Sequence, residues 1–213
     1  MPSFQYYRYT ELGAEKLHKR QEEDAINDFR KAIKCARKSA DAEAVNKCKI
    51  NLGAALVYVG RASEGVTVLE SATSSQHDHL LTGDRWYNLC LAHEDLGNTV
   101  EAKKCIQQSI KCYSKSQCSD AVVLKASSFC RFAYLCAELK EFENAAEAYA
   151  TAACSYSSAN DVPQQVQCLF QQARVLRCCE KCNDAIAVAD ECIKLCTAQL
   201  DAAQLPVDAA VGK

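Results

Sequence analysis

The sequence predicts an all-α fold, a right-handed α-solenoid of about five antiparallel helix pairs. The chain has only seven Gly and three Pro among its 213 residues, which is too few for the many tight connections of an all-β fold. Five segments also repeat one pattern of large and small residues at intervals of about 40 residues, and such repetition is typical of helical repeat architectures. Both observations favour long helices that stack in pairs.

The repeated pattern places a large residue followed by a small one in the first helix of each segment. The five large-small positions are Leu12-Gly13, Leu52-Gly53, Leu89-Cys90, Phe132-Ala133 and Gln172-Ala173. A further small residue opens the packing face of the second helix, at Ala25, Gly65, Ala102, Ala145 and Ala185. We expect these small side chains to let the two helices of a pair approach closely.

The helix pairs are expected over residues 4–40, 41–76, 80–116, 119–158 and 161–203. Each pair is amphipathic and cannot bury its apolar face alone, so neighbouring pairs should stack against one another. We therefore expect a single domain over residues 1–204 and a short tail over residues 205–213. Three polar loops interrupt the helices, the longest over residues 74–84, and residues of helix-capping type follow them at Asp84, Ser119 and Asp161.

This pattern resembles the tetratricopeptide repeat family, and the resemblance covers about residues 6–200. The spacing is longer than the roughly 34 residues of the commonest form, and the Pro that usually ends each repeat is missing. In both respects the chain resembles the Pins-type cell-polarity adaptors, the SNAP-type vesicle adaptors and the kinesin light chains. The resemblance implies a concave groove, lined by the first helix of each pair, that holds a segment of a partner protein.

The residue before each large position is polar, and we expect it to project into this groove at Glu11, Asn51, Asn88, Arg131 and Gln171. An amide side chain donates and accepts hydrogen bonds, so such a row can bond the backbone of an extended peptide. The Pins-type adaptors, which the chain resembles, use Asn at the matching position. Adjacent positions contribute one Lys and several aromatic and Arg side chains, which are frequent interface anchors: Lys47, Tyr58, Tyr87, Tyr134, Arg174 and Arg177. The alternative is that all of these are solvated polar groups on an open face.

Composition and charge disfavour several classes of function. The formal net charge is −2, with acidic and basic residues interspersed, so the chain offers no basic field to a nucleic acid. The first residues lack a signal-peptide pattern, and no apolar segment approaches the roughly 20 residues of a membrane span. We therefore expect a cytoplasmic protein, with the nucleus as an alternative, and no membrane insertion.

The 15 Cys residues are the unusual feature of the composition. Their odd number and the lack of a secretion signal favour free thiols that act as small apolar residues. The run CCEKC, with Cys178, Cys179 and Cys182, has the spacing of a zinc or redox site. The helix register separates these thiols from Cys192 and Cys196, so we expect no metal and no cofactor. No nucleophile, phosphate-loop or metalloprotease motif occurs either, so we expect no catalytic residue and no enzymatic activity.

The sequence thus favours a non-catalytic adaptor that binds a protein or peptide segment in its concave groove. The alternative is a structural subunit of a homo- or hetero-oligomeric complex, assembled through its terminal helices or its convex face. Partly uncovered side chains at Cys192, Ile193 and Cys196 would favour self-association through the C-terminal helix. A third hypothesis, a thiol-based metal or redox protein, depends on Cys178, Cys179 and Cys182.

Overall fold

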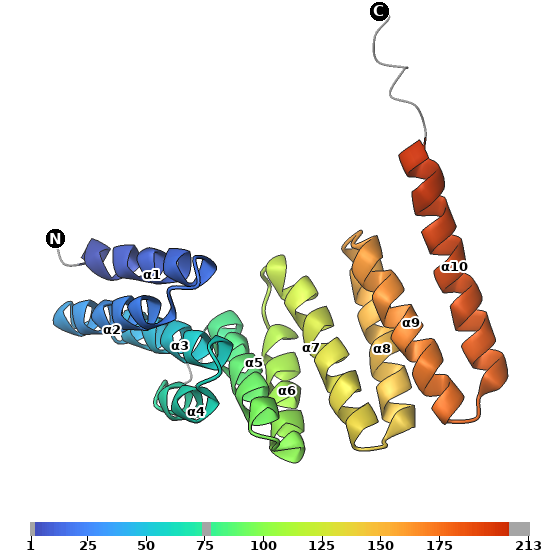
Figure 1. Cartoon of the computed structure of the whole chain (residues 1–213), viewed down its shortest axis with the longest axis horizontal. Helices are drawn as coiled ribbons and strands as arrows, with labels where there is room; N and C mark the ends of the chain where they lie inside the picture. Colours follow the sequence, from blue (N-terminus) through green and yellow to red (C-terminus); the bar gives the residue numbers. More distant parts are fainter. Residues whose placement is uncertain (1–2, 74–77, 205–213) are drawn as a thin grey trace, which may run out of the picture. The chain divides into compact units, whose positions relative to one another are not determined.

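The computed structural model describes the backbone of residues 3–73 and 78–204 and the side chains of residues 5–73 and 78–201. The described residues form ten helices and no strand (Figure 1). The helices are α1 (Ser3–His18), α2 (Glu22–Lys38), α3 (Ala42–Tyr58), α4 (Ala62–Glu70), α5 (His79–Asp95), α6 (Thr99–Tyr113), α7 (Asp120–Glu138), α8 (Phe142–Ser158), α9 (Val162–Cys178) and α10 (Cys182–Gln204). Helices that follow each other in the sequence pack against each other from α1 to α6 and again from α8 to α10. The predicted all-α solenoid of helix pairs is therefore confirmed.

The helices fall into two compact units, Met1–Ala121 and Val122–Lys213. In the first unit α1 packs on α2, α3 on α4 and α5 on α6, and α3 also contacts α2 and α5. In the second unit α8 packs on α9 and α9 on α10, while residues of α7 join those of α8 and α9 in one apolar cluster. The single domain over residues 1–204 stays a prediction, and the expected tail, residues 205–213, lies outside the described residues.

The two helices of each pair are joined by a three-residue turn whose middle residue has a positive φ. In the turn between α1 and α2, the N–H groups of Arg20 and Gln21 donate to the carbonyls of Leu17 and Lys16, respectively. This is the Schellman arrangement that satisfies the last carbonyl groups of a helix. The same φ, between 58° and 80°, recurs in all five turns, at Arg20, Gly60, Gly97, Lys140 and Glu180.

Small residues lie where the paired helices cross, as the sequence pattern predicts. A methyl group added to Gly13 would lie 2.9 Å from the ring of Phe29, and one added to Gly53 would lie 2.4 Å from Cγ of Leu69. Neither position has room for a side chain, so the close approach of α1 to α2 and of α3 to α4 depends on these glycines. The small position of the second helix is buried in all five pairs, at Ala25, Gly65, Ala102, Ala145 and Ala185.

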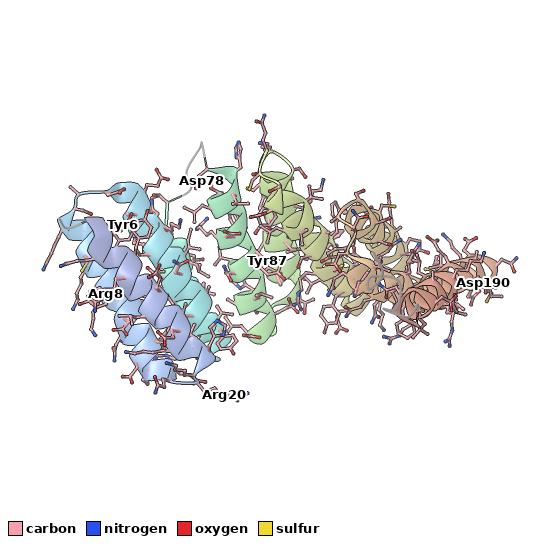
Figure 2. All side chains as sticks on the ribbon, turned by 90° about the horizontal axis from the view of Figure 1, so that it is seen from above. Tyr6, Arg8, Arg20, Asp78, Tyr87 and Asp190 are labelled. Carbon is pink, nitrogen blue, oxygen red and sulfur yellow. The ribbon has the colours of Figure 1, made fainter. Side chains whose placement is uncertain are left out.

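The start of α5 differs from the expectation that Asp84 caps this helix. Asp78, which is labelled in Figure 2, is the capping residue. Its carboxylate accepts a hydrogen bond of 2.9 Å from the backbone N–H of Leu81. Asp84 lies inside α5, where its carboxylate accepts a bond of 2.6 Å from the hydroxyl of Tyr113, and burial raises the pKa of this carboxyl above its usual range. At the other two loops, α7 begins directly after Ser119 and Asp161 caps α9 as expected.

A buried ion pair connects α1 and α2. The carboxylate of Asp28 is almost inaccessible to solvent, and it lies 2.5 Å from the ammonium group of Lys16 and 2.7 Å from that of Lys31. Burial alone would raise the pKa of Asp28, but the hydrogen bonds from the two Lys side chains outweigh it and lower the pKa. The carboxylate therefore stays ionised at neutral pH and ties the two helices together.

All 15 Cys side chains are free thiols. The sulfur atoms of Cys130 on α7 and Cys168 on α9 lie 3.0 Å apart, and this contact lowers the pKa of Cys130 and raises that of Cys168. Burial raises the pKa of Cys105 to about 11. The fully buried thiols pack as small apolar residues, in agreement with the sequence interpretation; they are Cys48, Cys90, Cys105, Cys136 and Cys168.

We expect the Cys residues to react with an alkylating reagent in two groups. Cys118 is exposed, whereas Cys105 is buried and has a raised pKa. Since the thiolate is the reactive form, Cys105 should be alkylated at least about 100-fold more slowly at pH 7.5 in the folded chain. Peptide mass spectrometry over a time course measures both rates in one sample. In the unfolded chain, used as the control, the two thiols should react at similar rates. Equal alkylation rates of Cys118 and Cys105 in the folded chain would contradict the burial of Cys105.

Candidate binding grooves

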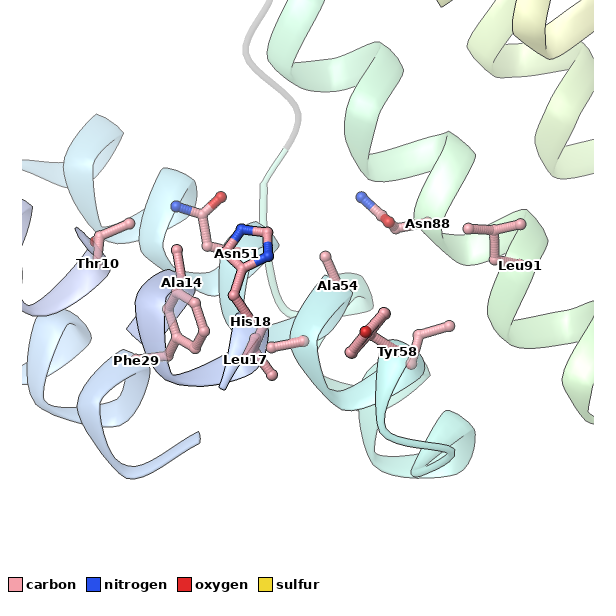
Figure 3. A pocket seen from close by; sticks show the side chains of 12 residues that line it. Thr10, Ala14, Leu17, His18, Phe29, Asn51, Ala54, Tyr58, Asn88 and Leu91 are labelled. Atoms are coloured by element: carbon pink, nitrogen blue, oxygen red, sulfur yellow. The ribbon is translucent and has the colours of Figure 1, made fainter. Parts of the chain in front are cut away.

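The first unit contains an open groove between α1, α2, α3 and α5, which we call the N-terminal groove (Figure 3). Its volume is about 550 Å³. Its walls are mainly apolar, with a few polar side chains among them. The lining residues are Thr10, Ala14, Leu17, His18, Phe29, Asn51, Ala54, Ala55, Val57, Tyr58, Asn88 and Leu91.

Two half-buried amides are the main hydrogen-bonding groups of the N-terminal groove. Asn51 of α3 and Asn88 of α5 both point into the open space of the groove in Figure 3. The Asn88 amide nitrogen donates a bond of 2.8 Å to the backbone carbonyl of Asp84, and the amide oxygen can still accept a hydrogen bond from a bound segment. Within the described ranges, the Asn51 amide has no hydrogen-bond partner. The groove therefore presents unused donors and acceptors to a bound segment.

The remaining lining residues of the N-terminal groove are complementary to uncharged, apolar side chains. The ring of Tyr58 is 72% exposed at the edge of the groove, so a bound segment can bury it. Leu17 and Leu91 contribute half-buried aliphatic surface from α1 and α5. None of the lining residues is Lys, Arg, Asp or Glu. Recognition in this groove therefore depends on amide hydrogen bonds and apolar contacts rather than on ion pairs.

The second unit contains another groove, here called the C-terminal groove, between α7, α8 and α9. Its volume is about 570 Å³. Arg174 and Arg177 are both exposed along α9, and the guanidinium group of Arg174 donates a bond of 2.9 Å to the amide oxygen of Gln171. The lining residues are Tyr134, Ala137, Glu138, Phe142, Tyr149, Gln171, Arg174, Val175, Arg177 and Cys178. With two Arg and one Glu, this groove is basic.

Tyr149 of α8 is a buried residue that lines the C-terminal groove. Burial raises the pKa of this phenol to about 12, and only the nearby positive charges of Arg174 and Arg131 oppose that effect. The phenol is therefore neutral at physiological pH, and the two Arg charges are not offset by a phenolate. Arg131 lies close enough to Tyr149 to affect its pKa, although it does not line the groove itself.

The structure distributes the predicted groove residues over the two units. Three of the predicted residues line the N-terminal groove: Asn51, Tyr58 and Asn88. Four line the C-terminal groove: Tyr134, Gln171, Arg174 and Arg177. Lys47, Tyr87 and Arg131 line neither groove. That these residues contact a partner stays a prediction.

Lys47 and Tyr87 both affect the half-buried hydrogen-bonded pair of Asp84 and Tyr113. The positive charge of Lys47 opposes the effect of burial on the pKa of Asp84, and Tyr87 is one of the neighbours of Tyr113. Their positions along α3 and α5 suggested the same face as Asn51 and Asn88. The structure places neither of them in the lining of the N-terminal groove.

Sequence reasoning missed the apolar walls of both grooves. Ala54 follows Asn51 by one helical turn and Leu91 follows Asn88 in the same way, so the spacing rule for one helix face would have found them. Leu17 and His18 of α1 and Phe142 of α8 also line the grooves. These come from other helices, and only the packing of the pairs reveals them.

Solved structures with a similar fold include the crystal structure of BtubC (BKLC) from P. vanneervenii. The TM-score is 0.78 and the sequence identity is 14%, and the match covers 91% of this chain and 80% of BtubC. A putative kinesin light chain of Podosopora anserina with nearly identical TPR-like repeats has a TM-score of 0.74 and 15% identity, over 94% of this chain and 98% of that one. The chain has a TPR-like repeat fold. The tetratricopeptide resemblance of the sequence is thus confirmed at the level of the fold.

A third TPR-like neighbour is a Rap protein, crystallised in complex with Competence and Sporulation Factor. Its TM-score is 0.67 and its identity 14%, over 92% of this chain and 55% of that one, so the chain spans about half of the Rap protein. No protein-family profile matches the sequence. At these identities, the comparisons define the fold and not the partner.

The described part of the TPR-like chain provides no cluster of three or more His, Cys, Asp or Glu residues arranged to hold a metal ion. In the CCEKC run, Cys178 ends α9 and Cys182 begins α10, with Cys179 in the turn between them. The thiol of Cys178 donates to the backbone carbonyl of Arg174. None of the described helices combines the length and the apolar character that a membrane span requires.

Proposed function

We propose that this protein is a non-catalytic adaptor that holds an uncharged, extended segment of a partner protein in the N-terminal groove. The observation that carries the proposal is the pair of half-buried amides, Asn51 and Asn88, that point into one apolar-walled groove (Figure 3). An extended backbone presents N–H and C=O groups alternately along its edge. The two amides can donate to the carbonyls and accept from the N–H groups of such a segment.

The walls of the N-terminal groove determine which side chains the segment carries. Leu17, Ala54 and Leu91 offer aliphatic contacts, and the exposed ring of Tyr58 offers a flat surface at the edge. A small or aliphatic side chain that enters this space loses contact with water and buries part of the Tyr58 ring. A charged side chain would lose its hydration without gaining a carboxylate, ammonium or guanidinium partner, because no lining residue is Lys, Arg, Asp or Glu. We therefore expect apolar side chains at the contact positions.

The TPR-like fold supports this proposal. The Rap protein of similar fold was crystallised with Competence and Sporulation Factor bound, so a scaffold of stacked helix pairs is suited to holding another molecule. In this chain the groove lies on the first helices of the pairs, which also carry the amides. The basic C-terminal groove extends the proposal: we expect it to take an acidic part of a partner.

The adaptor proposal is tested by affinity capture from a cell extract with the double variant Asn51→Ala/Asn88→Ala. The variant removes both amides without adding bulk, so α3 and α5 should keep their packing and their helicity. We expect at least one partner that the wild-type chain captures to be lost, by about tenfold or more in quantitative mass spectrometry, as two hydrogen bonds and their geometry disappear.

The matched control is Gln107→Ala/Gln108→Ala. These two amides are exposed on α6 and line neither groove, so their loss removes the same chemical groups from a different surface. Capture should equal that of the wild-type chain. Partners retained equally by both double variants would place the binding surface outside the N-terminal groove and contradict the proposal.

A further inference from the structure

The last helix, α10, has two apolar faces, and only one of them is covered within the described structure. Its inner face packs on α9, with Ala185, Val188 and Leu195 in the apolar clusters of the second unit. The second face carries large apolar side chains that are exposed to solvent. In Figure 1, α10 is the last helix of the chain. We call this face the outer stripe, and its residues are Ile186, Ala189, Ile193, Cys196 and Leu200.

The outer stripe exposes three large aliphatic side chains in a regular row. Ile186 is 60% exposed, Ile193 60% and Leu200 61%. They are spaced seven residues apart in the sequence, and Ala189 and Cys196 lie between them. Alternating steps of three and four residues are the spacing of a coiled-coil seam, the geometry by which one helix packs along another. The expected partner of this face is therefore a helix.

We propose that the outer stripe packs, antiparallel, against the outer stripe of a second copy of this chain. The sizes of the side chains carry this inference. When two α10 helices run antiparallel with Ile193 opposite Cys196 of the other copy, Leu200 falls opposite Ala189. The two-fold symmetry repeats both contacts. Every such layer then joins one large and one small residue, which fills space evenly along the seam.

A parallel arrangement of the same two helices packs less well. It would place Ile193 against Ile193 in one layer and Ala189 against Ala189 in the next. Layers of two small residues leave voids in the seam, and each void forfeits contacts between the helices. The charges are compatible with the antiparallel arrangement. Asp190 flanks the outer stripe, and in the antiparallel register it faces the neutral Thr197 of the other copy rather than another carboxylate.

The size of the seam sets the expected strength of the dimer. Helix α10 has 23 residues, and a seam of this length buries an area at the low end of specific protein interfaces. We therefore expect reversible association in the micromolar range. The mass should rise from the 23.4 kDa of one chain toward twice that value as the concentration increases. This inference is independent of the proposed grooves, which lie on other helices.

Analytical ultracentrifugation over a concentration series tests the seam. The variant Ile193→Glu introduces a charge into two layers at once, and we expect its dissociation constant to rise about 100-fold or more. Because Ile193 is exposed in the single chain, the circular dichroism spectrum should stay unchanged. The control Ala198→Glu adds the same charge at an exposed position of α10 outside the outer stripe, and it should dimerise as the wild type does.

A charge pair tests the antiparallel register. The variant Leu200→Glu should be monomeric, and the double variant Leu200→Glu/Ala189→Lys should recover dimerisation at least about tenfold, because these positions meet only across the antiparallel seam. A wild-type chain that stays monomeric at all concentrations overturns the proposal, as does a dimer that Ile193→Glu leaves intact. A dimer that Leu200→Glu breaks and Ala189→Lys does not restore overturns the antiparallel register.

Discussion

Replacing Gly53 with valine is expected to destabilise the first unit by about 3 kcal/mol or more. A Cβ atom at this position would lie 2.4 Å from Cγ and 2.7 Å from Cδ2 of Leu69 on α4. Carbon atoms make favourable contact at about 3.5–4.0 Å, so the helices would have to separate or Leu69 would have to leave its site. Valine also helps helix formation relative to glycine by roughly 0.5 kcal/mol, which is too little to compensate.

The surroundings of Gly53 leave little room for relief. Leu69 is completely buried, and a methyl group added to Gly65 on α4 would itself lie 3.2 Å from the carbonyl oxygen of Gly53. The backbones of α3 and α4 thus nearly touch at this crossing. Since Asn51 and Ala54 lie on the same helix, a displaced α3 would also deform the N-terminal groove. Thermal and urea unfolding, followed by circular dichroism, measure the loss of stability.

Two variants make the test of Gly53 specific. Ala198→Val adds the same β-branched side chain at an exposed position of α10 and should change the free energy of unfolding by less than about 0.5 kcal/mol. Leu69→Ala alone should cost about 2–5 kcal/mol through the cavity that it leaves. In combination with Gly53→Val the two costs should be clearly less than additive, because the valine enters the vacated space. Full additivity, or an unchanged Gly53→Val protein, would refute the close contact.

The sequence predicted the helix crossings well because sterics alone determine them. A small residue is required wherever a large side chain of the paired helix lies directly above it, as at Gly13 beneath Phe29 and at Gly53 beneath Leu69. A small residue recurs at this position of each pair at nearly the same spacing, so five copies reveal it together. The turns were less visible, because Arg20 and Lys140 adopt the positive φ that glycine would mark.

The start of α5 was predicted wrongly because a glycine, Gly83, can indicate either a turn or a close crossing of two helices. Gly83 lies beside Asp84, and together they resemble a loop followed by a capping residue. In the structure Gly83 is helical and buried, because the ring of Tyr113 lies over it: an added methyl group would lie 2.5 Å from that ring. The glycine thus serves a helix crossing rather than a turn. The capping signal lay earlier, at Asp78.

For the candidate grooves, the sequence identified residues on the first helices of the pairs but not the walls opposite them. Asn51 and Asn88 occupy equivalent positions of their helices, and this equivalence was enough to expect them on one surface. The contributions of Leu17 from α1 and Tyr149 from α8 depend on how neighbouring helices are rotated about their axes. That rotation follows from the packing of many side chains, which no short motif encodes.

Reversing the charge of the C-terminal groove should nearly abolish its affinity for acidic peptides. In the variant Arg174→Glu/Arg177→Glu, two attractive charges become repulsive, and we expect a glutamate-rich peptide to bind about 30-fold more weakly at low ionic strength. Because both guanidinium groups are exposed, the wild-type affinity should itself fall steeply between roughly 0.05 and 0.5 M salt. Fluorescence anisotropy of a labelled peptide measures both effects.

Two comparisons separate this basic groove from the net charge and from the other groove. Lys38→Glu/Lys111→Glu makes the same change in net charge at exposed residues of α2 and α6, and it should weaken binding by no more than about twofold. The variant Asn51→Ala/Asn88→Ala should bind the acidic peptide as the wild-type chain does, since neither amide lines the C-terminal groove. An equal loss in both charge-reversal variants would mean that the acidic peptide responds to the overall charge of the chain, and the specific role of Arg174 and Arg177 would be refuted.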